Sequence, residues 1–194
     1  MRRLIILIVM MVGCETMSAQ LPEGCTAKEL LKKMPSEVVP LLSRNNVLDC
    51  IDFIEHDSPT EVTNKMGGKS EMTELSPSLA SFFLTASNTL DIKVLPKGTD
   101  DVLIYVINTF TTDSLDDSSV KVYDKSWKPA ADAYQFRFPH PERYNSLKVS
   151  GKDDNMLLKE VVRPLLFEGE KREDRPDEVS MRMYVWNEKE GVYK

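Results

Sequence analysis

The chain has 194 residues, and its 25 Lys and Arg residues against 31 Asp and Glu residues give a formal net charge of −6 at pH 7. An acidic chain without a basic stripe is not expected to bind nucleic acid or anionic lipid headgroups, because both need clustered Lys and Arg. The length is sufficient for one domain that buries its own core without a structural metal.

The first residues show the pattern of a secretory signal peptide. Two arginines precede an apolar run over residues 4–12, and the small residues Ser18 and Ala19 follow. The run is too short to cross a bilayer. We therefore predict export, with residues 1–19 removed, and a membrane association only through this segment or a lipid anchor.

A lipid anchor is the alternative to simple cleavage. Residues 11–14, Met-Val-Gly-Cys, approximate a lipobox, after which Cys14 would be lipidated and become the new N-terminus. Cleavage after Ala19 would instead release a soluble protein. Both routes predict a periplasmic or outer-membrane-associated protein, with secretion as a further outcome.

The mature chain, residues 20–194, is predicted to be one α+β domain with a helical part over 20–57. Thr26 and Glu29 form a capping box for a first helix, and the segment 36–42 predicts a second, distorted by Pro40. A third helix begins near residue 44, carries an apolar stripe, and is closed by His56.

Two cysteines lie in this helical part. In an oxidising compartment Cys25 and Cys50 could form a disulfide, which would contribute about 3 kcal/mol on the chain-entropy model. Cys50 also suits a buried position on the apolar stripe, so a pair of free thiols is the alternative. No cysteine pair has metal-ligand spacing, and no metal or cofactor is predicted.

From residue 58 onward, short alternating runs separated by polar turns predict strands. Such short connections favour hairpins, so we expect an antiparallel sheet against which the helices pack. In the run 179–186, Val179, Met181, Met183 and Val185 alternate with polar or aromatic residues and are predicted to form the buried face. The predicted strands are 71–75, 80–85, 89–95, 102–110, 119–123, 156–167 and 179–186.

No catalytic motif has convincing spacing. The run from Gly67 to Ser70 resembles the end of a phosphate-binding loop, but Thr63 occupies the position of the leading glycine, so a simple turn is predicted. No serine lies in a nucleophile motif, and no catalytic residue is predicted.

Several residues between 34 and 75 resemble an exported family of unknown function from Bacteroides-type bacteria. The later residues Val120 to Asp124 and Trp127 are similar to that family's strand and turn. The resemblance implies a Gram-negative envelope location and an antiparallel sheet packed by N-terminal helices, as in small PepSY or beta-lactamase-inhibitor modules. It implies no activity, cofactor or catalytic residue. The matching segments are Met34-Pro35, 39–42, 45–46, 48–49, 51–53, 62–64 and 67–73.

These observations favour a non-enzymatic envelope protein that binds another protein, a peptide or cell-wall material. The candidate binding residues are the aromatics Trp127, Tyr184 and Trp186, whose alternative role is packing in the core. A hydrolase of envelope polymers is the second hypothesis. It would need carboxylates that only the fold brings together.

Overall fold

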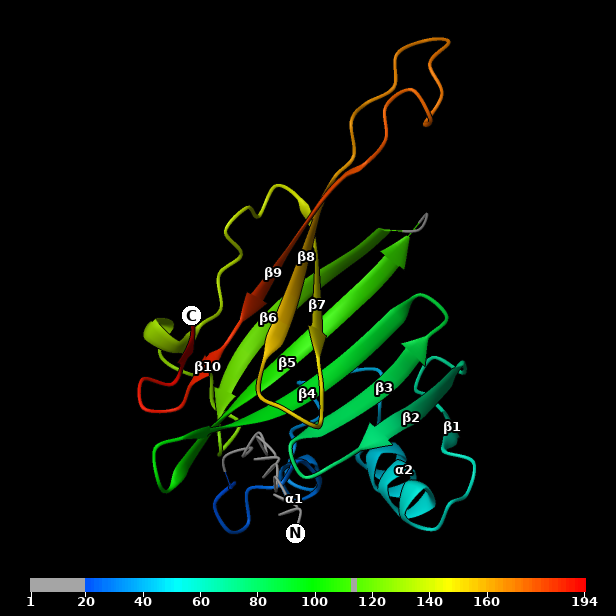
Figure 1. Ribbon diagram of the computed structural model, residues 1–194. Helices are drawn as coiled ribbons and strands as arrows, with labels where there is room; N and C mark the ends of the chain where they lie inside the picture. Colours follow the sequence, from blue (N-terminus) through cyan, green and yellow to red (C-terminus); the bar gives the residue numbers. More distant parts are fainter. Residues whose placement is uncertain (1–19, 113–114) are drawn as a thin grey trace, which may run out of the picture.

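A six-stranded antiparallel sheet forms the centre of the computed structural model, which describes residues 20–112 and 115–194 (Figure 1). The predicted signal peptide, including the lipidation candidate Cys14, lies outside the described residues. The strands follow one another in chain order across the sheet, which confirms the antiparallel prediction. They are β1 (Glu61–Thr63), β2 (Lys69–Leu75), β3 (Leu79–Thr85), β4 (Asn88–Lys97), β5 (Asp101–Thr112) and β6 (Leu115–Asp124).

Hairpin connections explain this order. The longest pairing joins β4 to β5 from Asn88 opposite Phe110 to Lys97 opposite Asp101. Gly98 begins the turn between these strands and has a φ of +64°, a conformation that glycine adopts without steric cost. Tight turns of this kind keep sequence neighbours adjacent in the sheet, and no crossover helix is required.

The α+β prediction is wrong, because the described chain is mostly β. Apart from one short 3-10 turn, η1 (Asp132–Tyr134), the described residues contain only the helices α1 (Ala27–Leu31) and α2 (Arg44–Glu55). The segment 36–42, predicted as a helix, forms turns. Pro40 lacks a backbone donor, and a segment of this length does not recover the cost of helix nucleation.

A second, three-stranded antiparallel sheet adds further β structure. It consists of β7 (Tyr144–Val149), β8 (Met156–Val162) and β9 (Glu178–Tyr184), in the order β7-β8-β9. The sequence patterns did not predict β7, and β8 ends before the predicted residue 167. Residues 163–177 form a projecting connection between β8 and β9, which we call the arm (Figure 1). A small hairpin of β10 (Trp186–Asn187) and β11 (Val192–Tyr193) ends the chain.

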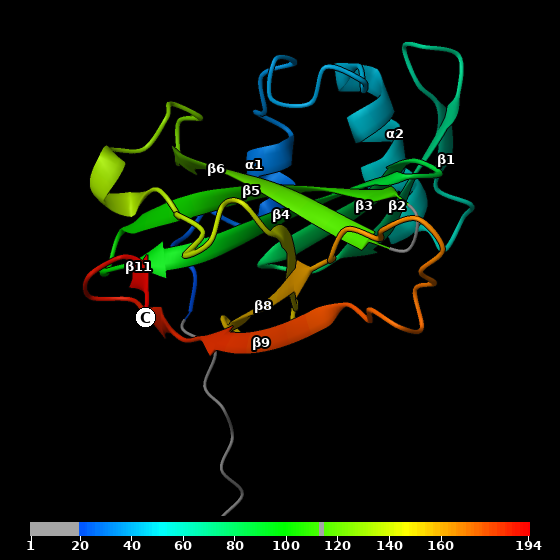
Figure 2. The same ribbon diagram turned by 90° about the horizontal axis from the view of Figure 1, so that it is seen from above.

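The main sheet lies between two layers, with the helices on one face and the second sheet on the other (Figure 2). Alternation along β4 and β5 divides their side chains between these layers. Ile92 and Ile104 belong to the core on the helical side, whereas Leu103 and Tyr105 pack against Leu158 of the second sheet. Both faces of the central strands are therefore buried, which accounts for their nearly continuous apolar sequence.

A buried lysine links the two sheets. The Lys93 side chain is 0 % exposed, and its Nζ donates hydrogen bonds to Ser78 Oγ, Ser150 O and Asp153 O at 2.8–2.9 Å. The same Nζ lies 3.1 Å from Asp154 Oδ1. These partners belong to the β7–β8 turn or to the turn before β3, so the ammonium group joins that turn to the main sheet.

Within the described residues, no helix has both the length and the hydrophobicity to cross a membrane.

A candidate ligand pocket

An apolar pocket lies on the helical side of the main sheet, where the helices leave the strand ends uncovered. Its volume is about 500 Å³. The floor comes from the adjoining ends of β3 to β6, and the irregular segment 38–41 with Met66 forms the wall. The lining residues are Val38, Val39, Pro40, Leu41, Met66, Leu84, Thr85, Asn88, Leu90, Val106, Asn108, Phe110, Ser119 and Lys121.

Two asparagines in this pocket carry amide groups without partners. Asn88 and Asn108 lie on the face of β4 and β5 that also carries Leu90 and Val106. Their Oδ1 atoms are buried, and neither has a hydrogen-bond partner among the described residues. A buried polar group left in this state costs about 1–3 kcal/mol, so a bound hydrogen-bond donor would relieve the cost.

A free cation stands at the edge of the same pocket. Lys121 is exposed on β6, and within the described chain its Nζ has no ion pair or hydrogen bond. Met66 and Phe110 are 86 % and 48 % exposed, which leaves a large apolar surface next to this charge. The pocket therefore combines apolar walls, amide acceptors and one positive charge, a composition typical of ligand sites.

Among the described residues that line the pocket, Lys121 is the only one with an ionisable side chain. No Asp, Glu, His or Cys lies among its lining residues. In the described residues as a whole, no group of three or more such side chains could hold a metal ion. The lining residues offer a ligand an apolar surface, hydrogen-bond acceptors and one positive charge.

Trp127, a predicted binding residue, lies at a different hollow and is buried. Its indole Nε1 donates a 3.0 Å hydrogen bond to the Leu30 carbonyl oxygen near the end of α1. The hollow around it, about 690 Å³, is lined mainly by polar residues. There the Lys125 ammonium donates to the Asp100 carbonyl oxygen at 3.1 Å, and a second lysine, Lys33, also lines the hollow.

Tyr184 and Trp186, the other predicted binding residues, join an aromatic cluster under the second sheet. Trp186 Nε1 donates to the Pro96 carbonyl oxygen at 2.7 Å, and its ring contacts Tyr105 edge to face. The Tyr184 ring packs on Phe136 with centroids 5.5 Å apart. These contacts give both side chains a packing role, and their role in partner binding stays a prediction.

Cys25 and Cys50 are both buried in the core on the helical side, and the structure contains them as free thiols. Burial raises the pKa of the Cys50 thiol to about 11. Whether Cys25 and Cys50 form a disulfide stays an open prediction, with free thiols as its alternative.

Three local signals in the sequence are confirmed. The capping box of Thr26 and Glu29 begins α1, and His56 ends α2 with its Nδ1 2.7 Å from the Asp52 carbonyl oxygen. The turn predicted at Gly67 joins β1 to β2, and Lys69 pairs with Glu61. Sequence reasoning missed Asn88 and Asn108, and the only signal available was the general depletion of asparagine in strands.

Comparisons with known proteins identify a family and a fold. Residues 20–164 match the family described as "Protein of unknown function (DUF3256)". A solved structure of a domain of an uncharacterised protein from Porphyromonas gingivalis W83 is similar, with 16 % identity, a TM-score of 0.68, and coverage of 86 % of this chain and 96 % of that one. The search of curated proteins finds no match. The family match spans most of the chain, and the protein therefore belongs to the DUF3256 family.

Proposed function

We propose that this protein is an exported, non-enzymatic binding module of the cell envelope, and that its apolar pocket takes the end of an apolar peptide with a free carboxylate. The observation that carries the proposal is the pair of unpartnered amides at Asn88 and Asn108 beside the free ammonium of Lys121. Export is supported by the signal-peptide pattern of residues 1–19.

The pocket chemistry favours a peptide over a simple fatty acid. A carboxylate would pair with Lys121 Nζ, and apolar side chains would cover Leu90 and Phe110. A fatty acid has no N–H group for the two amide oxygens, whereas a peptide backbone supplies one at each residue. The hydrolase hypothesis gains no support, because no carboxylate lines this pocket.

Binding is tested with fluorescently labelled tripeptides of leucine and valine, each made with a free carboxylate and with a carboxamide end. We expect the carboxylate form to bind the wild-type protein more tightly. Lys121→Gln should weaken its binding about threefold to tenfold and abolish the preference, because one partly exposed ion pair contributes on the order of 1 kcal/mol.

Lys125→Gln is the matched control, since Lys125 is an exposed lysine outside the pocket. This variant should bind like the wild type. A double substitution of Asn88 and Asn108 to leucine should weaken both peptides equally, because it removes the acceptors and leaves Lys121 in place. Equal binding of carboxylate and carboxamide by the wild type would contradict the proposal.

Export is tested by intact mass spectrometry of the protein purified from its native cells. A mature N-terminus at Gln20, or at a lipidated Cys14, is the expected result, because either follows from the signal pattern. A chain that retains residues 1–19 would contradict export. The same spectra, recorded before and after reduction, show whether Cys25 and Cys50 are bonded.

A further inference from the structure

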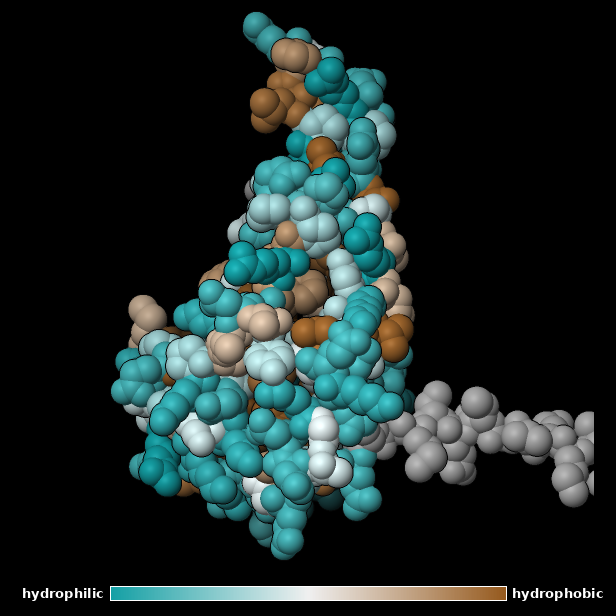
Figure 3. Space-filling model, turned by 90° about the vertical axis from the view of Figure 1, so that its left-hand side faces the viewer, coloured by the Kyte–Doolittle hydropathy of each residue, from teal (hydrophilic) through white to brown (hydrophobic). Residues whose placement is uncertain are grey.

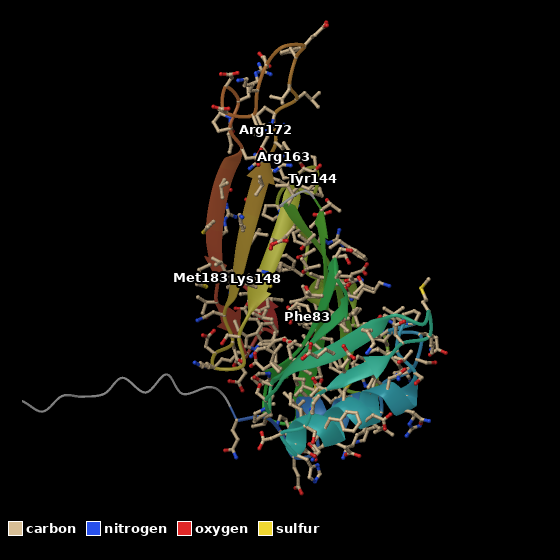
Figure 4. All side chains as sticks on the ribbon, turned by 90° about the vertical axis from the view of Figure 1, so that its right-hand side faces the viewer. Phe83, Tyr144, Lys148, Arg163, Arg172 and Met183 are labelled. Atoms are coloured by element: carbon tan, nitrogen blue, oxygen red, sulfur yellow. The ribbon has the colours of Figure 1, made fainter. Side chains whose placement is uncertain are left out.

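The outer edge of the second sheet carries an unusual strand. Six of the seven residues of β9 are exposed, including Val179, Met181 and Met183 at 52 %, 66 % and 56 %. Figure 4 shows β9 as the outermost strand, with Met183 on it. Leu165 and Phe167 of the arm are exposed as well, and Figure 3 shows hydrophobic surface on the arm.

The backbone of β9 is unpaired along this edge. Its regular ladder to β8 runs from Glu178 to Tyr184 without a register shift. Among the described residues, no other backbone or side chain bonds to the main chain of these seven residues. The opposite edge of the sheet is different, because the β7 amides of Asn145 and Leu147 donate to side chains of β6 at 3.0 Å.

An open, regular, apolar edge is a template for another strand, and proteins commonly block such edges with proline or a bulge. β9 contains neither of these. Its side chains are also self-complementary. In an antiparallel pair of β9 strands centred on Ser180, Glu178 faces Arg182 of the second copy, and Val179 faces Met181.

Other registers lose this complementarity. Centring the pair on Met181 places Arg182 opposite Ser180 and leaves Glu178 opposite Tyr184. Centring it between Ser180 and Met181 places Val179 opposite Arg182, which mixes apolar and charged side chains on one face. In the described chain Glu178 has no ion pair, and the Arg182 guanidinium interacts only with Tyr184, through a 3.5 Å hydrogen bond and a cation–π contact. Both charges are therefore available to a partner.

We propose that β9 is a self-association edge, at which two copies of this chain pair antiparallel about a two-fold axis at Ser180. The two three-stranded sheets then form one continuous six-stranded sheet. Each copy contributes the same strand, as a closed two-fold interface requires. The edge lies on the opposite side of the main sheet from the ligand pocket, so this inference does not depend on the proposed function.

Charge reversal tests the register, measured by sedimentation equilibrium of the full protein. Edge pairing buries a small surface, so we expect the wild type to dimerise with a dissociation constant of about 10–100 µM. Glu178→Arg and Arg182→Glu should each weaken dimerisation at least about fivefold, because each places like charges opposite one another twice. The double variant should restore the wild-type constant.

A mixture of the two single variants is the sharpest test. Each Glu178→Arg chain then faces an Arg182→Glu chain, both cross-strand pairs become complementary, and the mixture should associate more tightly than either variant alone.

Glu37→Arg and Lys152→Glu make the same charge changes at exposed positions away from β9 and should dimerise like the wild type. Circular dichroism confirms that each variant is folded. The proposal would be overturned if the wild type were monomeric at about 500 µM, or if the double variant did not recover dimerisation. A monomeric wild type would instead favour an extended segment of another protein as the partner of this edge.

Discussion

At the scale of single residues, Trp127 shows how one side chain joins distant segments. It has a φ of +61°, which is uncommon for a residue other than glycine, and this conformation directs a buried indole towards α1. The Nε1–H group donates to Leu30 O across 97 residues of sequence. The residue proposed from sequence as a binding aromatic thus holds the end of the first helix against the main sheet.

Trp127→Phe should lower the free energy of unfolding by about 0.5–1.5 kcal/mol, because the buried Leu30 carbonyl oxygen loses one of its two donors and keeps only the Lys33 N–H group at 3.0 Å. Urea unfolding measures the change. Trp186→Phe is the matched control, since its hydrogen bond to Pro96 O is only partly buried and water can replace the lost donor. If both variants lost the same free energy of unfolding, the buried hydrogen bond of the Trp127 indole would not make a larger contribution to stability than that of Trp186.

At the scale of elements, the docking of the second sheet depends on its β7–β8 turn. Lys93 reaches this turn from β4 and bonds to Ser150 and Asp153. Gly151 approaches β2 so closely that an added Cβ would lie 2.5 Å from Glu74 Oε1. A glycine and a buried ammonium group together position the sheet, and the apolar contacts of Leu147 and Leu158 complete the packing.

Lys93→Met should destabilise the protein by about 3 kcal/mol or more, because Asp154 and two carbonyl oxygens lose a buried cation. Hydrogen exchange should increase in β7 and β8 before it does in β2 and β3. Lys148→Met is the control, since its ion pair with Asp116 is long, at 4.0 Å, and exposed, and it should change stability by less than about 0.5 kcal/mol. Uniform exchange across both sheets would contradict a local role for Lys93.

At the scale of the whole molecule, two separate cores lie on opposite faces of one sheet. Each core contains a group whose burial disfavours ionisation. On the helical side burial raises the pKa of Cys50 to about 11, and on the other side it raises the pKa values of Tyr105 and Tyr193. Ionisation of these groups at alkaline pH therefore opposes folding in both cores.

Stability should fall as the pH rises from about 9 to 11. The Cys50 thiol, with an ordinary pKa of 9.0, ionises over this range in the unfolded chain, whereas the folded thiol keeps its proton until about pH 11. The unfolded state then binds fewer protons, which lowers the free energy of unfolding. Urea titrations under reducing conditions at pH 7, 9 and 10.5 measure this slope.

The slope should decrease in Cys50→Ala, because that variant removes the thiol and leaves the two tyrosines. Cys25→Ala removes the other buried cysteine and serves as the matched control for the loss of a buried thiol from the same core. A slope unaffected by Cys50→Ala would assign the whole effect to other groups.

Local patterns in the sequence are sufficient to specify the helix starts and five strands of the main sheet. The capping boxes at Thr26 and Ser43 begin the two α-helices, although only the first was recognised, and the alternation from residue 71 to 123 specifies five consecutive strands. These signals arise from hydrogen bonds and periodicities among near neighbours, which any folded form of the chain retains. The family resemblance is confirmed on the same segments.

Which surfaces are covered depends on the tertiary structure. In β9 the alternation is present as predicted, but Val179, Met181 and Met183 face solvent, while Tyr184 packs against Phe136. A pattern of period two defines two faces of a strand and cannot assign one of them to the interior, because that choice depends on layers contributed by distant segments. The pocket amides of Asn88 and Asn108 and the buried Lys93 depend on the same long-range packing, and no local pattern specifies them.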